Sequence, residues 1–302
     1  MNRIQISAVA LGLALSRAAV TAETVTAGRL MVHPHRVILD DSPPRAKGER
    51  GQPPKVPGRS AEIALINGGK ERSAYRISFM TMDMDTEGRL FEKARVPGEV
   101  AAADLIRFSP RKVVLEAGST QTIRIQVRMR EGLPPGEYRS HMMFRAVPLE
   151  DEPQASANPP AQEPAEPSLS VNLKAIYGLS IPIIIRHGAT QATISISSLR
   201  WELAPNEGHP ALRFRLERSG NRSVFGHMDA TWTPRGGLPK VVGNLKGIAI
   251  YTNISYRDVN FELDGLPAKE LGPGTLKIKY QDPETRKVLA EASLELPPKP
   301  PS

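Results

Sequence analysis

The chain has 302 residues, of which 28 are proline and 24 are glycine, and it contains no cysteine. Proline and glycine together exceed their usual share of about 12%, which argues against a helical protein. The absence of cysteine excludes disulfides, zinc–cysteine sites and thiol nucleophiles. A formal net charge of +8 usually suggests nucleic acid, but for an exported chain we expect acidic protein partners or anionic surfaces and no nucleic acid.

Export is predicted by the first 22 residues, which have the pattern of a signal peptide. Arg3 supplies a charged start, an apolar stretch runs from Ile6 to Leu15, and Ala22 ends a small-residue cleavage site. Ala27 offers a second cleavage position. No later apolar run approaches the roughly 20 residues that span a bilayer. We therefore expect a soluble exported protein whose mature chain has no integral membrane segment.

Short segments of alternating apolar and polar residues dominate the rest of the chain. Residues 60–66, 75–79 and 122–127 are examples, and this period of two is typical of half-buried strands. Turn clusters such as 67–69 and 133–136 separate the segments at spacings that suit antiparallel sheets packed as sandwiches. The pattern contains no convincing amphipathic helix. The sequence therefore predicts an all-β protein.

Two stretches interrupt this rhythm. Residues 41–58 are rich in proline, glycine and charge, and we expect a long flexible loop there. Residues 149–167 contain five prolines, five acidic residues and no basic residue, which predicts a disordered acidic tether. A regularly alternating strand follows the tether, with apolar side chains at Leu169, Val171, Leu173, Ala175 and Tyr177, and it runs on through 178–180 into residues 181–186. A second strand-rich region then extends to Leu296.

The chain offers no convincing catalytic or metal-binding pattern. Residues 83–88 imitate the start of a calcium loop, but Ala94 stands where a bidentate glutamate is needed, so a turn between strands is expected instead. His33 and His35 would share one face of a strand, yet no third metal ligand is signalled nearby. The common nucleophile, phosphate-loop and dinucleotide patterns are missing. We therefore expect no enzyme, no cofactor and no metal.

Several motifs in the first half of the chain occur in a characteristic order. They are Ile106-Arg107-Phe108-Ser109-Pro110, Val114 to Gly118, Gln121 to Ile125, Gly136 to His141 and Ala146-Val147-Pro148. Their order and spacing resemble the PapD-like periplasmic chaperones of the chaperone-usher pilus pathway. Residues 36–39 are similar to the first-strand motif of that family. Residues 177–183 resemble the strand that crosses between domains in its archaic-type branch.

This resemblance implies two immunoglobulin-like β-sandwich domains in tandem, spanning residues 23–186 and 187–302 after a signal peptide at 1–22. The acidic tether at 149–167 then becomes a loop inside the first domain. The resemblance also implies a non-enzymatic periplasmic chaperone for pilin-like subunits. Such a chaperone caps each subunit by donating an edge strand, in donor-strand complementation, before assembly at an outer-membrane usher. Whether the free protein caps its own edge as a homodimer is left open.

The residues after the tether also suit an edge strand on physical grounds. A subunit that lacks its last strand exposes an apolar groove and unpaired backbone groups, which a neighbouring strand can satisfy. Leu169, Val171 and Leu173, followed by Ala175, present the required period. Each large apolar side chain buried in this way contributes about 1.5–3 kcal/mol. The alternative is that these side chains fill the core of their own domain.

Arg36 is the other candidate for subunit binding. By resemblance, the matching arginine lies between the domains and, with a lysine on the crossing strand, binds the terminal carboxylate of the subunit. This sequence has Pro182 at the position of that lysine. Lys174 and Arg186 are candidate replacements, so the second cation is left open. An alternative function is an immunoglobulin-like exported binding or adhesion module that does not cap subunits.

Overall fold

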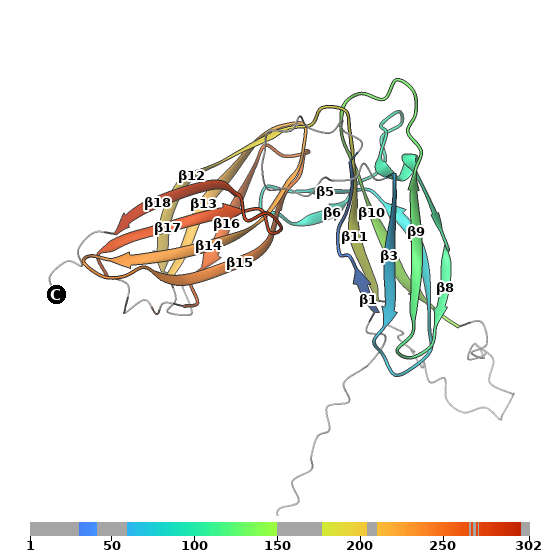
Figure 1. The fold of residues 1–302 in the computed structure, drawn as a ribbon, viewed down its shortest axis with the longest axis horizontal. Coiled ribbons are helices and arrows are strands. Elements are labelled where there is room, and N and C mark those ends of the chain that lie inside the picture. The colour runs from blue at the N-terminus through green and yellow to red at the C-terminus, as the bar shows by residue number, and fades with distance from the viewer. Residues whose placement is uncertain are drawn as a thin grey trace, which may run out of the picture.

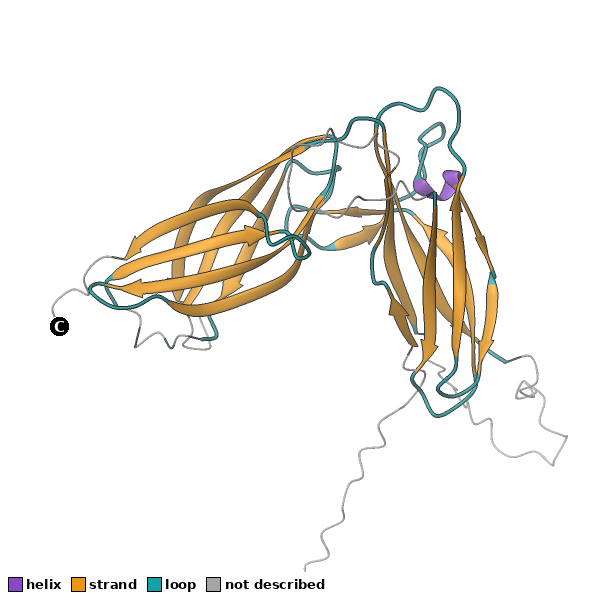
Figure 2. Cartoon of the chain, in the orientation of Figure 1, coloured by secondary structure: helices purple, strands orange, loops and turns teal. Residues whose placement is uncertain are grey.

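The computed structural model describes residues 30–40, 59–149, 177–203, 210–265, 267, 270 and 272–296. Within them the chain forms two β-sandwiches that stand at an angle to one another (Figure 1). Strands make up almost all of the regular structure, and a short 3-10 helix at Ala102–Leu105 is the exception in Figure 2. No helix in these ranges is long and apolar enough to cross a membrane. The expected all-β fold with two sandwiches in tandem is confirmed.

The first sandwich consists of two sheets. One has the strand order β1 (Leu30–His33), β3 (Ser60–Asn67), β9 (Thr120–Val127) and β7 (Ile106–Ser109). The other has the order β2 (Val37–Asp40), β11 (Gly178–His187), β10 (Gly136–Val147), β4 (Ser73–Met80) and β8 (Lys112–Leu115). The strands are antiparallel to their neighbours except β2, which runs parallel to β11.

The core of the first sandwich lies between these sheets. Every second residue of the strands faces inward, so Ile63 and Ile123 of one sheet meet Phe144 and Ile183 of the other in one buried cluster. A small hairpin of β5 (Met82–Met84) and β6 (Leu90–Glu92) follows β4. The turn expected at residues 83–88 therefore lies in this hairpin, where Gly88 adopts a positive φ of 84°.

The start of the first sandwich differs from the expectation in one respect. The chain forms two short strands in different sheets, β1 and β2, with a bend between them. His33 ends β1, whereas His35 lies in the bend, so the prediction that both share one face of a strand is wrong. Pro34 stands between them, and proline has no N–H group with which to continue the ladder of β1.

The second sandwich also has two sheets. One has the order β12 (Ala192–Leu203), β13 (Pro210–Gly220) and β16 (Tyr256–Glu262). The other has the order β15 (Lys240–Ile250), β14 (Val224–Pro234), β17 (Gly274–Gln281) and β18 (Val288–Leu296). Leu212, Phe261, Leu276 and Tyr280 are fully or almost fully buried in its separate core.

The chain leaves the first sandwich through β11, which ends at His187, and enters the second through β12. We keep 23–186 and 187–302 as the proposed domain limits. The predicted signal peptide, the loop at 41–58 and nearly all of the acidic tether lie outside the described residues. So do Leu169, Val171, Leu173, Lys174 and Ala175, whose predicted role is taken up below as a proposal.

Candidate functional site

The apolar stripe of β11 changes its surroundings along the strand. Ile181, Ile183 and Ile185 point into the core of the first sandwich and are almost fully buried. The same alternation continues backwards to Leu179 and Tyr177, which are 38% and 53% exposed. The stripe therefore runs out of the core toward the residues that precede the strand.

The backbone of β11 changes its partners at the same place. Along its whole length β11 pairs with β10 on one side. On its other side β2 pairs only with Ile183 to Arg186. Among the described residues, no strand pairs with this second side of residues 178–182. Within the described residues this part of β11 is thus a sheet edge, and the backbone groups of a sheet edge can pair with another strand.

The outward face of the same sheet meets the second sandwich at a junction. Met84 and Ile184 of the first sandwich pack with Ala249 and Tyr251 of the second in a small buried cluster. The β5–β6 hairpin, which reaches toward the second sandwich in Figure 1, adds two interdomain hydrogen bonds. Asn253 Nδ2 donates to the carbonyl of Met84 over 2.8 Å, and the Asp258 N–H donates to the carbonyl of Thr86 over 2.7 Å.

Arg36 lies in this junction, directly before β2. Its guanidinium carbon lies 4.5 Å from the centre of the Phe225 ring of the second sandwich, a cation–π contact. Its Nε and Nη2 atoms are buried and have no hydrogen-bond partner among the described residues. Burial lowers the pKa of Arg36 below the ordinary value, but arginine keeps its charge in proteins. The residue is therefore a half-buried cation with two buried, unused donors.

Arg186, the other candidate cation in the described ranges, is already paired. Its Nε donates to Oε2 of Glu137 over 3.2 Å, and its Nη2 donates to the carbonyl of Ser223 over 3.4 Å. Both members of this ion pair are buried. Pro182 lies opposite His141 in the β10–β11 register. The structure thus brings Arg36 and Arg186 to the same junction but leaves only the former with unused buried donors.

Two further residues of the junction were not predicted from the sequence. Arg139 of β10 places its guanidinium carbon 3.8 Å from the centre of the Tyr251 ring and donates to the Met82 carbonyl over 2.8 Å. His141 is buried, and neither of its ring nitrogens has a partner among the described residues. Burial, together with the nearby charge of Arg139, lowers the pKa of His141 to about 4.

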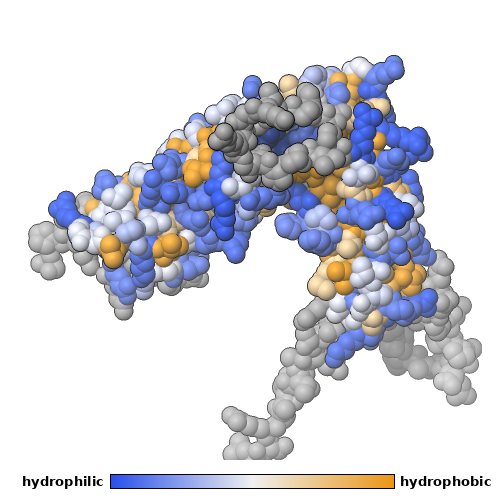
Figure 3. Space-filling view, viewed as in Figure 1, coloured by the Kyte–Doolittle hydropathy of each residue, from blue (hydrophilic) through white to orange (hydrophobic). Residues whose placement is uncertain are grey.

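A signal for these residues exists in the sequence of β10. Glu137, Arg139 and His141 occupy alternate positions, so they project from one face of a strand whose other face is mostly apolar. Alternation alone does not distinguish solvent from a second domain, which is why the junction was missed. The molecular surface in Figure 3 is hollowed between the two sandwiches, where apolar and polar residues mix. The described residues contain no group of three or more side chains that could hold a metal ion.

Comparisons with known proteins give structural matches only. No family model matches the chain, and no curated protein does. The solved structures that match include several chaperones. The YadV chaperone is 13% identical, with 88% of this chain and 99% of that chain covered and a TM-score of 0.42.

Two further matches have similar values. The CsuC–CsuE chaperone–tip subunit complex, from the archaic chaperone-usher Csu pili of Acinetobacter baumannii, is 13% identical over 88% of this chain and 97% of that chain, with a TM-score of 0.40. The Escherichia coli chaperone DraB is 15% identical over 89% of this chain and 96% of that chain, with a TM-score of 0.39.

Proposed function

We propose that this protein is a periplasmic chaperone, exported by a signal peptide at residues 1–22, that caps pilus subunits before they reach an outer-membrane usher. It acts by donating a strand and performs no catalysis. The observation that most supports this proposal is the apolar stripe of β11, which leaves the core at Leu179 and coincides with a sheet edge at residues 178–182.

The proposed donor strand continues this stripe backwards. Leu169, Val171, Leu173 and Ala175 are all odd-numbered, like the core residues of β11, so a continuous strand puts them on the same face. Leu179 and Tyr177 already expose much of their apolar surface. Burying each large apolar side chain in the groove of a subunit contributes about 1.5–3 kcal/mol before the strand's ordering cost is subtracted. Backbone pairing along the edge adds to this gain.

The terminal carboxylate of the subunit is the proposed ligand of Arg36. A buried polar group without a partner costs about 1–3 kcal/mol, and the planar fork of an arginine suits a carboxylate. Binding the carboxylate would satisfy the Nε and Nη2 atoms of Arg36. Arg186 is held by Glu137, which makes it a poor second cation. Lys174 is nine residues before Ile183, which pairs with Val37 directly after Arg36, so on a continuous strand it lies about 30 Å from Arg36. We therefore propose that Arg36 alone supplies the charge of the anchor.

A capture experiment tests the donor strand. Periplasmic extract of the native cell is passed over the wild-type protein, a Val171→Asp/Leu173→Asp variant and a Ser170→Asp/Asn172→Asp control. Each protein is first shown to be folded by circular dichroism. The control adds the same two charges to the opposite face of the same strand. Captured proteins are identified by mass spectrometry.

We expect the wild type and the control to retain small, β-rich exported subunits and the Val171→Asp/Leu173→Asp variant to lose them. If all three proteins capture the same partner, or none captures any, the strand has a structural role only. In that case the protein is better described as an immunoglobulin-like binding or adhesion module. The same preparations, run by size-exclusion chromatography without extract, show whether the free protein caps its edge as a homodimer.

A further inference from the structure

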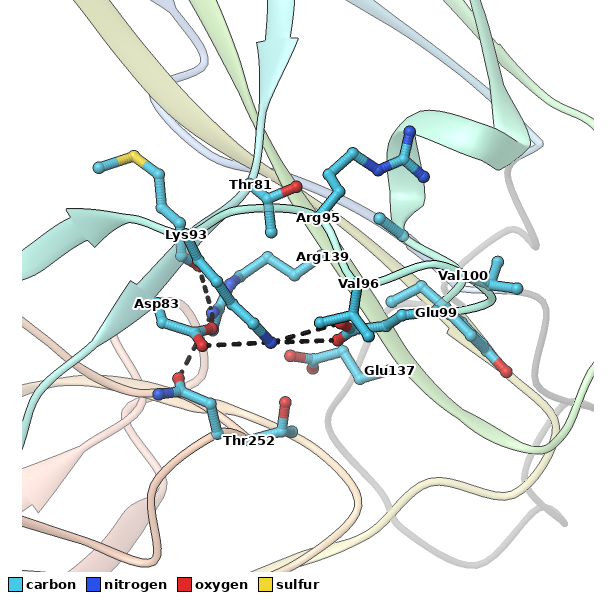
Figure 4. Close-up of a pocket in the computed structure, with 14 residues that line it drawn as sticks. Thr81, Asp83, Lys93, Arg95, Val96, Glu99, Val100, Glu137, Arg139 and Thr252 are labelled. Atoms are coloured by element: carbon cyan, nitrogen blue, oxygen red, sulfur yellow. Dashed lines mark hydrogen bonds and ion pairs between the residues drawn. The ribbon is translucent and has the colours of Figure 1, made fainter.

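A second concave site lies at the junction, on the β10 side of the sheet. In the sheet order β2-β11-β10, β11 separates it from the strand that follows Arg36. The pocket has a volume of about 280 Å³ and is formed mainly by the first sandwich, with Thr252 and Asn253 contributed by the second. Figure 4 shows Lys93 reaching between Asp83 and Glu99, with Glu137 and Arg139 also lining the pocket.

Two buried charged side chains of this pocket each have one unused atom. Glu137 is fully buried, and its Oε2 accepts from Arg186 and from the Ser223 N–H, but its Oε1 has no partner among the described residues. The Arg139 side chain is 8% exposed, and its Nη2 donates to the Met82 carbonyl and to Asp83, whereas its Nη1 is buried without a partner. Buried charged groups are normally hydrogen-bonded, so both atoms point to a missing ligand.

The two unused atoms have opposite requirements. Oε1 of Glu137 needs a donor, ideally a cation, and Nη1 of Arg139 needs an acceptor, ideally an anion. The residues are two positions apart on β10, so their side chains leave the same face of the strand. A single small molecule that carries both kinds of group would satisfy both atoms.

The charge of the whole lining supports a ligand without net charge. Lys93, Arg95 and Arg139 supply three positive charges, and Asp83, Glu99 and Glu137 supply three negative charges. At the rim the Lys93 Nζ donates to Glu99 Oε2 over 3.3 Å and lies 3.6 Å from Oδ2 of Asp83, which ties segment 93–100 to β5. A ligand with a net charge would upset this balance, whereas a zwitterion preserves it. Val96 and Val100 provide an apolar wall for a small side chain.

We propose that this pocket binds a small zwitterion of the α-amino-acid type. Its ammonium group donates to Oε1 of Glu137, its carboxylate accepts from Nη1 of Arg139, and its side chain lies against Val96 and Val100. Because Thr252 and Asn253 close the pocket from the second sandwich, the ligand also links the two domains. The proposal is independent of subunit capture, since it concerns the isolated protein.

Isothermal titration calorimetry on the mature protein tests the site with three probes of similar size. L-valine carries both charges, L-valinamide lacks the carboxylate and N-acetyl-L-valine lacks the ammonium group. Titration to about 10 mM detects dissociation constants in the millimolar range. We expect L-valine to bind and each of the other two probes to bind at least about tenfold more weakly, since about 1.4 kcal/mol corresponds to a tenfold change. Absence of L-valine binding, or equal binding of all three probes, overturns the proposal.

Two variants connect the binding to the pocket. Val96→Trp enlarges a rim side chain that is 50% exposed and fills the pocket without removing a buried charge. Val114→Trp on β8, where the side chain is 44% exposed and outside the pocket lining, is the matched control. We expect Val96→Trp to lose L-valine binding and Val114→Trp to retain it. If Val96→Trp binds L-valine as tightly as the wild type, the pocket is not the site.

Discussion

Arg186 and Glu137 form a buried ion pair that joins the end of β11 to the start of β10, with 3.2 Å between Nε and Oε2. Only 5% of the Arg186 side chain and none of the Glu137 side chain is exposed. The pair also reaches the second sandwich, because both side chains hydrogen-bond to the backbone of Ser223. It therefore connects the strand proposed for subunit capture with the second domain.

Removing one member of this pair is expected to destabilise the protein strongly. Arg186→Ala leaves the buried Glu137 carboxylate with the Ser223 N–H as its one remaining hydrogen-bond donor among the described residues, and breaking such a pair costs about 3–5 kcal/mol. Urea unfolding measures the loss. Arg200→Ala, which removes an exposed pair with Glu202 on β12, is the control and should cost less than about 1 kcal/mol. Equal losses for the two variants would contradict the structural role assigned to the buried pair.

His141 should make the stability depend on pH. Its pKa is about 4 in the folded protein and about 6.5 when unfolded, so the unfolded state binds more protons between these values. The folded state is therefore expected to lose about 3 kcal/mol of stability from this residue as the pH falls from about 7 to about 4. Arg139 and Tyr251 face the imidazole and stay protonated throughout this range.

Urea unfolding of the wild type and of His141→Gln at several pH values measures this dependence. The variant lacks the titrating group and should lose less stability on acidification. An NMR titration locates the pKa directly. An imidazole that titrates near 6.5 in the folded protein would show that the residue is not buried as described.

Replacing Arg36 should weaken subunit binding but leave the stability of the fold nearly unchanged. Arg36→Met keeps an apolar stem over Phe225 but removes the charge and the two unused donors. We expect the free energy of unfolding to change by less than about 1 kcal/mol, because the lost cation–π contact is offset by the removal of two buried, unpaired donors. Subunit binding should weaken by about ten- to a hundredfold, the equivalent of a charge-assisted hydrogen bond of about 1.5–3 kcal/mol.

Surface plasmon resonance measures the affinity of Arg36→Met and of the wild type for a captured subunit. Arg124→Met is the control. Arg124 is an exposed residue of β9 on the other sheet, so its loss should leave both quantities unchanged. Unchanged subunit binding by Arg36→Met would exclude the proposed carboxylate anchor.

Gly88 should be required for the contact between the β5–β6 hairpin and the second sandwich. Gly88 and Gly98 both have a φ of +84°, so alanine is strained at either position by about 1–2 kcal/mol. A Cβ atom at Gly88 would lie 2.1 Å from Cζ of Arg257, whereas a Cβ atom at Gly98 would meet nothing within 4 Å. We expect Gly88→Ala to be more destabilising than Gly98→Ala. We also expect it to widen the distribution of distances between the two sandwiches, as measured by small-angle X-ray scattering. Equal effects would mean that the hairpin does not hold the domains.

Much of the fold could be predicted from local alternation. The predicted segments 60–66, 75–79 and 122–127 fall within β3, β4 and β9, because each has one face on the core of its own sandwich. The break between β1 and β2 was not predicted, since the pairing of a short strand with one sheet or the other depends on tertiary packing.

The site was harder to predict for a related reason. Arg36 was identified by resemblance, but its contact with Phe225 joins residues far apart in the sequence. Arg139 and His141 both lie against Tyr251 of the second sandwich. The period of β10 gives their common face but not what covers that face.

Site-specific photo-crosslinking in the native periplasm tests the central claim most directly. A photoreactive phenylalanine analogue is placed at residue 173, on the proposed stripe, or at residue 172, on the opposite face. Capping along the β11 edge predicts that the probe at 173 crosslinks to small exported subunits and that the probe at 172 does so far less. Equal crosslinking from both positions, or none from either, would contradict the claim that this strand captures subunits through its odd-numbered face.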